Sequence, residues 1–381
     1  MNFNYSAEQL GIQEALNRYI EKSYGFEYRR QLARDMTCSR EAWAMYAELG
    51  LLALPFAESD GGLGGGGVER MLVLQGFGKG LLLEPYVPTV ILAGGALALL
   101  GSEVQKAMIT DIAEGKLLMA FAHQEPESRY CRTHVETSAR RTPSGWVLNG
   151  RKASVHAAPF ADRFLISARV DGAARDPDGI SLFLVDAAAT GLACDAYGMH
   201  DGTCAAELRL QDVAVAEQDA IGAPGQALAA IEQVLDHAVA ASCAESLGAM
   251  EMLMTLTIEY LQTRKQFGQP IGKFQALRHR AAEMQIRIEQ ARAMTLQAAV
   301  QSDHANAAER GAGVSGAKAL IGEAARFVGQ QAVQLHGGMG LTDELSVGHY
   351  FKRLTMLEAA YGDTDYHLGR YGAHMQEQMQ S

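Results

Sequence analysis

The sequence predicts a multidomain α+β protein in which two helical segments flank a β-rich segment. Residues 1–117 contain apolar and amphipathic stretches of helical length, and residues 226–381 contain long runs rich in Ala, Leu, Met and Glu, which favour helices. Residues 118–225 instead contain short β-type runs separated by turn signals. A chain of 381 residues is long enough for two or three domains. We therefore place the domain boundaries near residues 117 and 225.

The N-terminal segment has recognisable helix signals. Ser6 precedes Gln9 by three residues, which is the spacing of a capping box. Another Ser-Glu start at residues 102–103 predicts a helix that ends near Gly115. The predicted helices cover residues 7–21, 39–48, 68–83, 89–100 and 103–114.

The middle and C-terminal segments differ in their periodicity. The predicted strands cover residues 117–122, 134–140, 146–149, 163–170, 180–185, 192–196, 205–210 and 213–215. Because no helices intervene between them, an antiparallel barrel or sandwich is expected. The last segment has helical runs at residues 226–263, 275–301 and 316–335, which predict a four-helix bundle.

Composition excludes several classes of protein. There are 33 basic against 44 acidic residues, a net charge of −11, and no basic stripe, which argues against nucleic-acid binding. The five cysteines are scattered without a Cys-x-x-Cys pair, and the eleven histidines lack metal-ligand spacing, so neither a disulfide framework nor a metal site is expected. The start lacks a signal peptide and no apolar stretch reaches membrane-spanning length. We expect a cytoplasmic protein.

Three motifs of the sequence contain glycines. Residues 62–67 (Gly-Leu-Gly-Gly-Gly-Gly) satisfy a dinucleotide-binding pattern, but that fingerprint requires a preceding strand and a βαβ unit, so a flexible turn is predicted. Residues 264–271 (Arg-Lys-Gln-Phe-Gly-Gln-Pro-Ile) and 334–340 (Gln-Leu-His-Gly-Gly-Met-Gly) each fit an ordinary helix end. Glycines also let a backbone approach a ligand closely.

Together and in this order, the motifs resemble the acyl-CoA dehydrogenase family. Further matching segments are residues 121–126 (Phe-Ala-His-Gln-Glu-Pro), 148–152 (Leu-Asn-Gly-Arg-Lys) and 179–185 (Gly-Ile-Ser-Leu-Phe-Leu-Val). The resemblance covers nearly the whole chain. It implies an N-terminal helical domain, a middle antiparallel β-barrel, a C-terminal four-helix bundle, and FAD between the last two.

The resemblance also implies a reaction and partners. The family removes a proton from the α-carbon of an acyl-CoA and transfers a hydride from the β-carbon to flavin N5, as in fatty acid metabolism. An electron-transfer flavoprotein then accepts the electrons. The family assembles as a tetramer, here either a homotetramer or a heterotetramer with a homologous subunit.

Residues transferred by motif give the expected cofactor contacts. Arg264 resembles the arginine that contacts the flavin pyrophosphate across a subunit interface, and a guanidinium suits that dianion. Gln266 and Phe267 belong to the same element. Thr364 resembles a threonine that contacts FAD after the catalytic loop. Gln334, Gly337 and Gly338 resemble contacts to the adenosine and pyrophosphate of a neighbouring chain's FAD.

The catalytic loop departs from the family pattern. The usual base is a glutamate in Tyr-Glu-Gly-Thr, whereas residues 361–364 read Tyr-Gly-Asp-Thr. Alignment on Tyr361 and Thr364 places Gly362 at the base position and Asp363 one residue beyond it, whereas an ungapped count from Gln334 places Tyr361 there. Asp363 and, second, Glu245 are the candidate bases. Asp363 could instead cap the last helix, and Glu245 could pair with a cation such as Arg292.

Three functional hypotheses follow from this departure. The chain is an acyl-CoA dehydrogenase with an atypical base, or a non-catalytic subunit of a heteromeric dehydrogenase, or an oxidase or monooxygenase on the same fold. The breadth of the family favours the first hypothesis. The ending Gly-Asp-Thr-Asp-Tyr-His at residues 362–367 supports the second, because it resembles the small-subunit branch typified by pimeloyl-CoA dehydrogenase.

Overall fold

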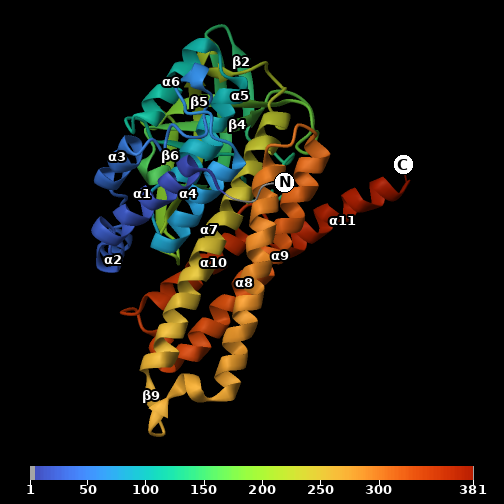
Figure 1. Ribbon diagram of the computed structural model, residues 1–381. Coiled ribbons are helices and arrows are strands. Elements are labelled where there is room, and N and C mark those ends of the chain that lie inside the picture. Colours follow the sequence, from blue (N-terminus) through green and yellow to red (C-terminus); the bar gives the residue numbers. More distant parts are fainter. Residues whose placement is uncertain (1–4, 381) are drawn as a thin grey trace. The chain divides into compact units, whose positions relative to one another are not determined.

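The computed structural model describes residues 5–380 and confirms the predicted order of helices, strands and helices (Figure 1). The chain forms two compact units. The first comprises Met1–Arg29, Gly66–Leu82 and Val239–Ser381, and the second comprises Arg30–Gly65 and Leu83–Ala238. Each unit is therefore assembled from segments that are far apart in the sequence.

The second unit contains short helices around a sheet. Ser102 caps α6 in a capping box with Gln105. The run predicted as one helix at residues 89–100 is a π-helical segment that continues into α5. The elements in or entering this unit from the N-terminal side are α2 (Phe26–Arg34), α3 (Arg40–Glu48), η1 (Glu58–Asp60), η2 (Val87–Gly94), α5 (Gly95–Leu100) and α6 (Glu103–Ala113). Helix α2 was not predicted, because its sequence is short and strongly polar.

The sheet of this unit is mixed rather than wholly antiparallel, which corrects the expected topology. Its strand order is β6-β7-β3-β2-β4-β5-β8, and β1 pairs with β4 in parallel. The two runs predicted at residues 205–210 and 213–215 form one strand that contains Asp212 in the left-handed region (φ 50°). The strands are β1 (Met119–Ala122), β2 (Ser138–Thr142), β3 (Gly145–His156), β4 (Arg163–Arg169), β5 (Ile180–Asp186), β6 (Leu192–Gly198), β7 (Cys204–Val215) and β8 (Ala220–Ile221), with η3 (Ala158–Phe160) and η4 (Glu217–Asp219) between them.

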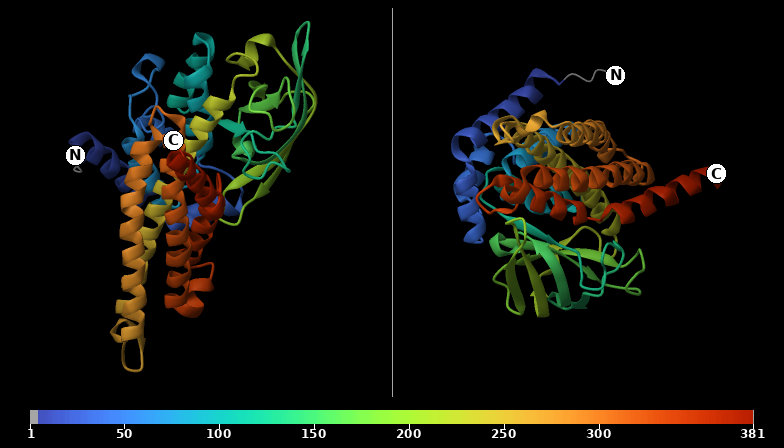
Figure 2. Two further views of the ribbon diagram at one scale, coloured as in Figure 1. Left: turned by 90° about the vertical axis from the view of Figure 1, so that its right-hand side faces the viewer. Right: turned by 90° about the horizontal axis from the view of Figure 1, so that it is seen from below.

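The first unit is a helical bundle built mainly from the C-terminal third of the chain. Ser6 and Gln9 form the predicted capping box at its first helix. Helices α8 and α9 run side by side for most of their length (Figures 1 and 2). The elements are α1 (Ala7–Ser23), α4 (Gly67–Gly80), α7 (Leu228–Thr263), which begins in the second unit, β9 (Lys265–Gln266), β10 (Gln269–Pro270), η5 (Ile271–Lys273), α8 (Gln275–Ser302), α9 (Ala307–His336), η6 (Gly337–Leu341), α10 (Ser346–Ala359) and α11 (Thr364–Gln380).

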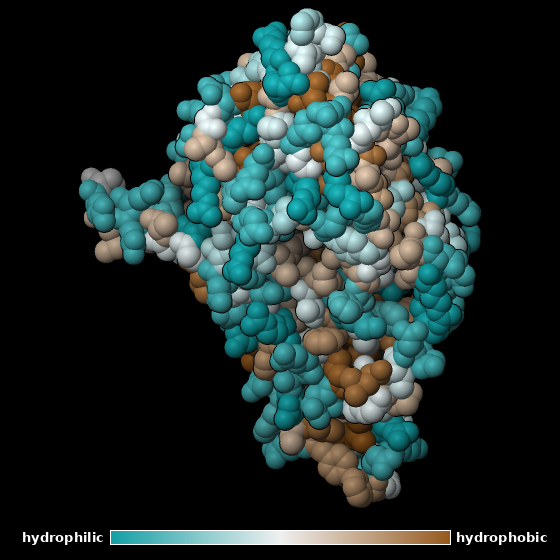
Figure 3. All heavy atoms as spheres, turned by 180° about the vertical axis from the view of Figure 1, so that it is seen from behind, coloured by the Kyte–Doolittle hydropathy of each residue, from teal (hydrophilic) through white to brown (hydrophobic). Residues whose placement is uncertain are grey.

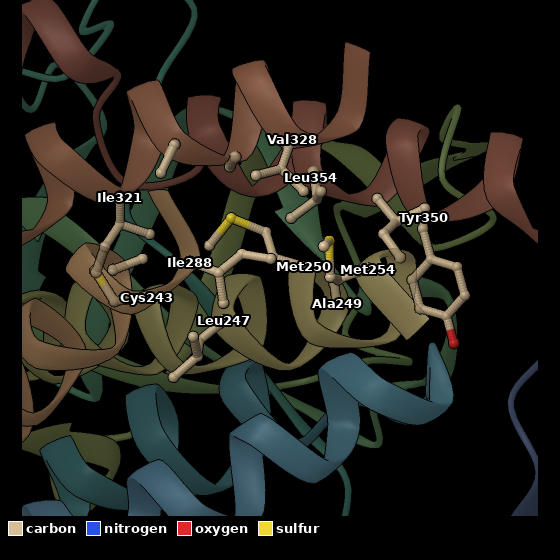
Figure 4. Packing of buried hydrophobic residues seen from close by; sticks show 14 of the residues in the cluster. Cys243, Leu247, Ala249, Met250, Met254, Ile288, Ile321, Val328, Tyr350 and Leu354 are labelled. Atoms are coloured by element: carbon tan, nitrogen blue, oxygen red, sulfur yellow. The ribbon is translucent and has the colours of Figure 1, made fainter. Parts of the chain in front are cut away.

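The core of the bundle is filled by aliphatic side chains and methionines. Met250 of α7, Ile288 of α8 and Val328 of α9 are at most 1% exposed and belong to one cluster (Figure 4). Unbranched methionine fills irregular gaps between helices. This core fixes the relative positions of α7, α9 and α10, which carry the candidate site.

Glycines allow α4 and α7 to touch through their backbones. A Cβ atom at Gly78 would lie 1.9 Å from the Glu245 carbonyl oxygen, and one at Gly248 would lie 1.9 Å from the Gln75 carbonyl oxygen. No side chain fits at such distances, so both positions require glycine.

The glycine run at residues 62–67 is a packed turn rather than a flexible one. A Cβ at Gly62 would lie 2.1 Å from the Phe56 carbonyl oxygen, and one at Gly67 would lie 1.9 Å from the Ala299 carbonyl oxygen. The amide of Gly67 donates to Asp303 Oδ2 at 2.6 Å. A carboxylate at a helix N-terminus stabilises the helix dipole, so Asp303 anchors the start of α4 to the end of α8.

We predict that Gly248→Ala destabilises the first unit. A methyl group inserted into the α4–α7 contact forces the two backbones apart, and overpacking of this kind costs about 1–3 kcal/mol or more. Chemical denaturation should show the loss. Gly369→Ala in α11 is the matched control, because a Cβ there meets nothing within 4 Å. Equal stability of the two variants would contradict the close contact.

Candidate functional site

The predicted site residues form two groups that are separated along the length of the helical bundle in the first unit. The end group consists of Arg264, Gln266, Phe267, Gln334, Gly337 and Gly338. The loop group consists of Glu245, Asp363 and Thr364, together with their neighbours Arg353 and Tyr361. At a rise of 1.5 Å per residue, about 27 Å of α7 lies between Glu245 and the last residue of the helix. A single small ligand cannot contact both groups of one chain.

The first part of the end group is a short hairpin at the end of α7. Residues Gln266 and Gln269 pair across it, and the turn uses positive φ at Phe267 (52°) and Gly268 (77°). The Phe267 ring is 89% exposed. The Arg264 side chain is exposed and makes no hydrogen bond or ion pair within residues 5–380. The hairpin thus presents a free guanidinium to solvent.

The second part of the end group is the C-terminal end of α9. Gln334, Gly337 and Gly338 are exposed, and a Cβ at either glycine would meet nothing within 4 Å. Tyr260 of α7 stacks on His336 of α9 with ring centroids 4.4 Å apart. This stacking brings the two parts to the same end of the bundle, where Figure 3 shows hydrophobic side chains exposed at the surface.

The chemistry of the end group fits a dinucleotide. A guanidinium supplies two parallel donors to a phosphate, an amide side chain both donates and accepts, and an open glycine turn admits close approach of a ligand. Arg264, Gln334, Gly337 and Gly338 could therefore hold the pyrophosphate and adenosine of FAD. These contacts remain predictions.

The loop group centres on a buried ion pair. Glu245 is 2% exposed. Its Oε1 accepts from Arg353 Nε at 2.6 Å and lies 2.6 Å from Arg353 Nη2. The expectation that Arg292 pairs with Glu245 is wrong, because Arg292 instead contacts Glu251 and Glu289. The true partner lies on α10, which no local sequence pattern links to α7.

Tyr361 lies within the electrostatic range of this ion pair. It has left α10 and adopts a left-handed backbone with φ 60°. Burial raises the pKa of its phenol well above the usual value, and the charges of Arg353 and Glu245 also act on it. A phenol whose pKa is raised keeps its proton at neutral pH and is not available to accept another. Tyr361 is therefore not a substitute for a carboxylate base.

Asp363 caps α11, which argues against its predicted role as the base. Its Oδ1 accepts the amide proton of Tyr366 at 2.9 Å, and this is the contact that an N-cap residue makes. Thr364 is 7% exposed, and its amide and hydroxyl both donate to Glu358 Oε1, at 3.1 and 2.9 Å. Its hydroxyl thus holds the loop together and is turned away from solvent.

The second unit contains its own buried polar cluster, built from three motif residues of the sequence. Lys152, which is not exposed, donates to Glu125 Oε1 at 2.7 Å and to Ser167 Oγ at 3.0 Å. Glu125 also accepts the amide of Thr137 at 3.0 Å. His123 contacts Ser167 Oγ at 2.9 Å. Because the partners satisfy one another, the cluster holds the strands and loops in register.

Within residues 5–380, no group of three or more His, Cys, Asp or Glu side chains is arranged to hold a metal ion. No helix in that range combines the length and apolar composition needed to cross a membrane.

Three family models match successive parts of the chain. They are the acyl-CoA dehydrogenase N-terminal domain at residues 6–116, the middle domain at residues 120–213 and the C-terminal domain at residues 225–376.

Individual proteins resemble the chain over almost its full length. The probable acyl-CoA dehydrogenase YngJ of Bacillus subtilis is 29% identical over 96% of this chain and 97% of its own. Acyl-CoA dehydrogenase FadE12 of Mycobacterium tuberculosis is 30% identical over 91% of this chain and 90% of its own. A chain in the crystal structure of the ChsE4-ChsE5 complex from Mycobacterium tuberculosis has a TM-score of 0.87 and 27% identity, with 99% of each chain covered.

We predict that His123 makes stability fall at acid pH. Burial and the nearby Lys152 charge lower its pKa to about 3, against about 6.5 in an unfolded chain. The unfolded state therefore binds the proton first, and stability falls as pH drops from about 6.5 towards 3, by about 1.4 kcal/mol per pH unit. Urea unfolding at pH 7 and 5 should show a smaller loss for His123→Asn than for the unmodified chain. Identical losses would exclude this histidine as the cause.

We predict that Arg264→Ala weakens FAD retention and leaves the fold intact. Its guanidinium has no partner within the described part of the chain, so its removal breaks no internal contact. Hydrogen bonds to charged groups contribute about 1.5–3 kcal/mol, which corresponds to a loss of affinity of roughly tenfold or more. Flavin stoichiometry after gel filtration measures the effect. Arg278→Ala, which removes another exposed cation of this unit, is the control, and equal flavin loss in both would refute the assignment.

Proposed function

The chain belongs to the acyl-CoA dehydrogenase family, and we propose that it is an FAD-dependent dehydrogenase chain that acts on the α,β-bond of an acyl-CoA thioester. The observation that supports this most directly is the end group. Arg264 and Gln334 present exposed hydrogen-bond donors at the end of the bundle that also carries the open turn of Gly337 and Gly338. Within the described residues, no contact of these two side chains explains why they are placed there. An internal structural role does not explain that arrangement, whereas binding of a phosphate-containing cofactor does.

The distance between the two groups supports an oligomer. The end group of one chain lies too far from its own loop group to serve the same flavin. In the proposed assembly, the end group contacts the FAD of a neighbouring chain, and the loop group faces its own substrate. We propose a tetramer formed with identical or homologous chains, with an electron-transfer flavoprotein as the electron acceptor.

Bound FAD supplies the hydride acceptor, so the protein must supply a base for the α-proton. Among the two predicted carboxylates, Asp363 is engaged as a helix cap. Glu245 is the remaining candidate. Arg353 fixes its Oε1 through hydrogen bonds, and the crossing with α4 fixes the backbone of α7 at the same residue. Because the carboxylate is already held in place, little conformational entropy has to be lost to orient it for proton transfer.

The second candidate function is a non-catalytic subunit that completes a partner's flavin site. A specific observation favours it: the carboxylate of Glu245 is already paired with Arg353. By the count from Gln334, the loop position of the family's base is Tyr361, which carries no carboxylate. The ChsE4-ChsE5 complex pairs two differently named chains, and a similar pairing would let a partner provide the base.

Anaerobic bleaching of the flavin separates the two candidates. If Glu245 is the base, we predict that the purified chain bleaches with a suitable acyl-CoA. Glu245→Gln should then slow bleaching by about 10²–10⁴-fold while FAD remains bound, since general-base catalysis contributes that much. Asp363→Asn is the control. Asn caps helices as well as Asp, so this variant should bleach normally.

The opposite outcome identifies the non-catalytic subunit. In that case the unmodified chain binds FAD but does not bleach with any acyl-CoA in a panel of short, long, branched and steroid thioesters. Tyr361→Glu, which restores a carboxylate at the loop position, should then bleach. Bleaching by the unmodified chain that persists in both Glu245→Gln and Asp363→Asn would exclude both carboxylates as the base.

A further inference from the structure

A buried lysine on α9 contacts both α7 and α10 near the point where α10 ends before Tyr361. Lys318, near the middle of α9, is 2% exposed. Its Nζ donates to Ser242 Oγ of α7 at 3.0 Å and to the carbonyl oxygen of Leu357 in α10. Burial lowers the pKa of this ammonium, so its retention in the core requires those acceptors.

The carbonyl that Lys318 contacts has a special place in α10. In an α-helix the carbonyl of residue 357 accepts from the amide of residue 361. Tyr361 has left the helix with φ 60°, so the ammonium bonds the carbonyl that this amide would otherwise occupy. A cation at a helix C-terminus also stabilises the helix dipole. Lys318 therefore favours the end of α10 at this residue.

The other end of the loop rests on the same helix. A Cβ at Gly322, one turn after Lys318, would lie 2.5 Å from Thr364 Oγ1. Thr364 is held by Glu358, which also accepts from Arg326 Nη2 at 2.9 Å. Two neighbouring positions of α9 therefore contact the residues on either side of the loop 360–363. Lys318 contacts Leu357 before the loop, and Gly322 contacts Thr364 after it.

The loop between these ends is strained. Tyr361 is a non-glycine residue in the left-handed region, and Gly362 has φ 121°. Such conformations persist only where surrounding contacts impose them. Residues in them cluster at functional sites, and here the charges of Glu245 and Arg353 act on the strained residue.

We propose that Lys318 is a positioning residue: its ammonium, bound to Ser242 and Leu357, fixes the strained loop of residues 360–363 and so sets the position of Tyr361. The effect of Lys318 on flavin reduction rests on the proposed function, whereas its effect on the loop does not. Lys318 contacts the reacting groups only through this loop.

Hydrogen–deuterium exchange with mass spectrometry tests the loop directly. In Lys318→Met, which keeps the buried stem and removes the charge, amides of residues 360–366 should exchange about ten to a hundred times faster, as expected for the loss of a charged hydrogen bond. Amides in the middle of α8 should be unchanged. Arg292→Met is the matched control, because it removes a cation from the same bundle that contacts Glu251 and Glu289. Equal protection of residues 360–366 in the unmodified chain, Lys318→Met and Arg292→Met would overturn the proposal.

Two milder variants keep the test usable if Lys318→Met does not fold. Ser242→Ala removes one acceptor and should speed exchange in the same segment by a smaller factor. Gly322→Ala displaces Thr364 and should also speed exchange of residues 360–366, without any change to the ammonium of Lys318. Unchanged exchange in both variants would contradict the proposal that α9 positions the loop.

Flavin bleaching then tests the link to chemistry. If the chain bleaches, Lys318→Met should lower the bleaching rate at saturating acyl-CoA by about tenfold or more with FAD stoichiometry unchanged. A faster-exchanging loop with a normal bleaching rate would overturn the link to the reaction. If no variant bleaches, the proposed dehydrogenase activity fails, and the exchange data still decide the role of Lys318.

Discussion

Backbone contact at glycines is the constraint on which the first unit depends. Gly78 and Gly248 bring α4 against α7 at Glu245, and Gly322 lets Thr364 rest on α9. The contacts at Gly78 and Gly248 are with backbone atoms and leave no room for a side chain, so α4 and α7 have a single relative position there. The crossing of α4 and α7 fixes the backbone at Glu245, and the contact at Gly322 fixes Thr364 after the loop. Close packing at glycines therefore positions both parts of the loop group.

The charges of the bundle serve two different purposes. Lys318 and Arg353 are mostly buried, and each is engaged by acceptors on other helices. A buried charge is costly unless it is paired, so these cations hold the structure. Arg264 is exposed and has no internal partner within residues 5–380. An acidic chain can therefore offer a local donor to an anionic ligand although its net charge is −11.

Electrostatics couples Tyr361 to the buried ion pair of the first unit. Arg353 of α10 binds the carboxylate of Glu245 on α7, and the charges of both residues act on the Tyr361 phenol. Changing either charge therefore changes the environment of Tyr361. The two proposed functions differ in whether Glu245 accepts the proton or a partner chain supplies the base.

Local sequence patterns were sufficient to predict the features that depend on neighbouring residues. The capping boxes at Ser6 and Ser102, the helix end before Arg264 and the exposed glycines after Gln334 were predictable, because caps and turns use contacts within a few residues. Only the tertiary structure decided that Glu245 pairs with Arg353 rather than Arg292, that Asp363 is a cap rather than a free carboxylate, and that β1 runs parallel to β4. The ion pair joins residues 108 positions apart. Periodicity reports which face of a helix is buried, but it does not specify which distant residue lies against that face.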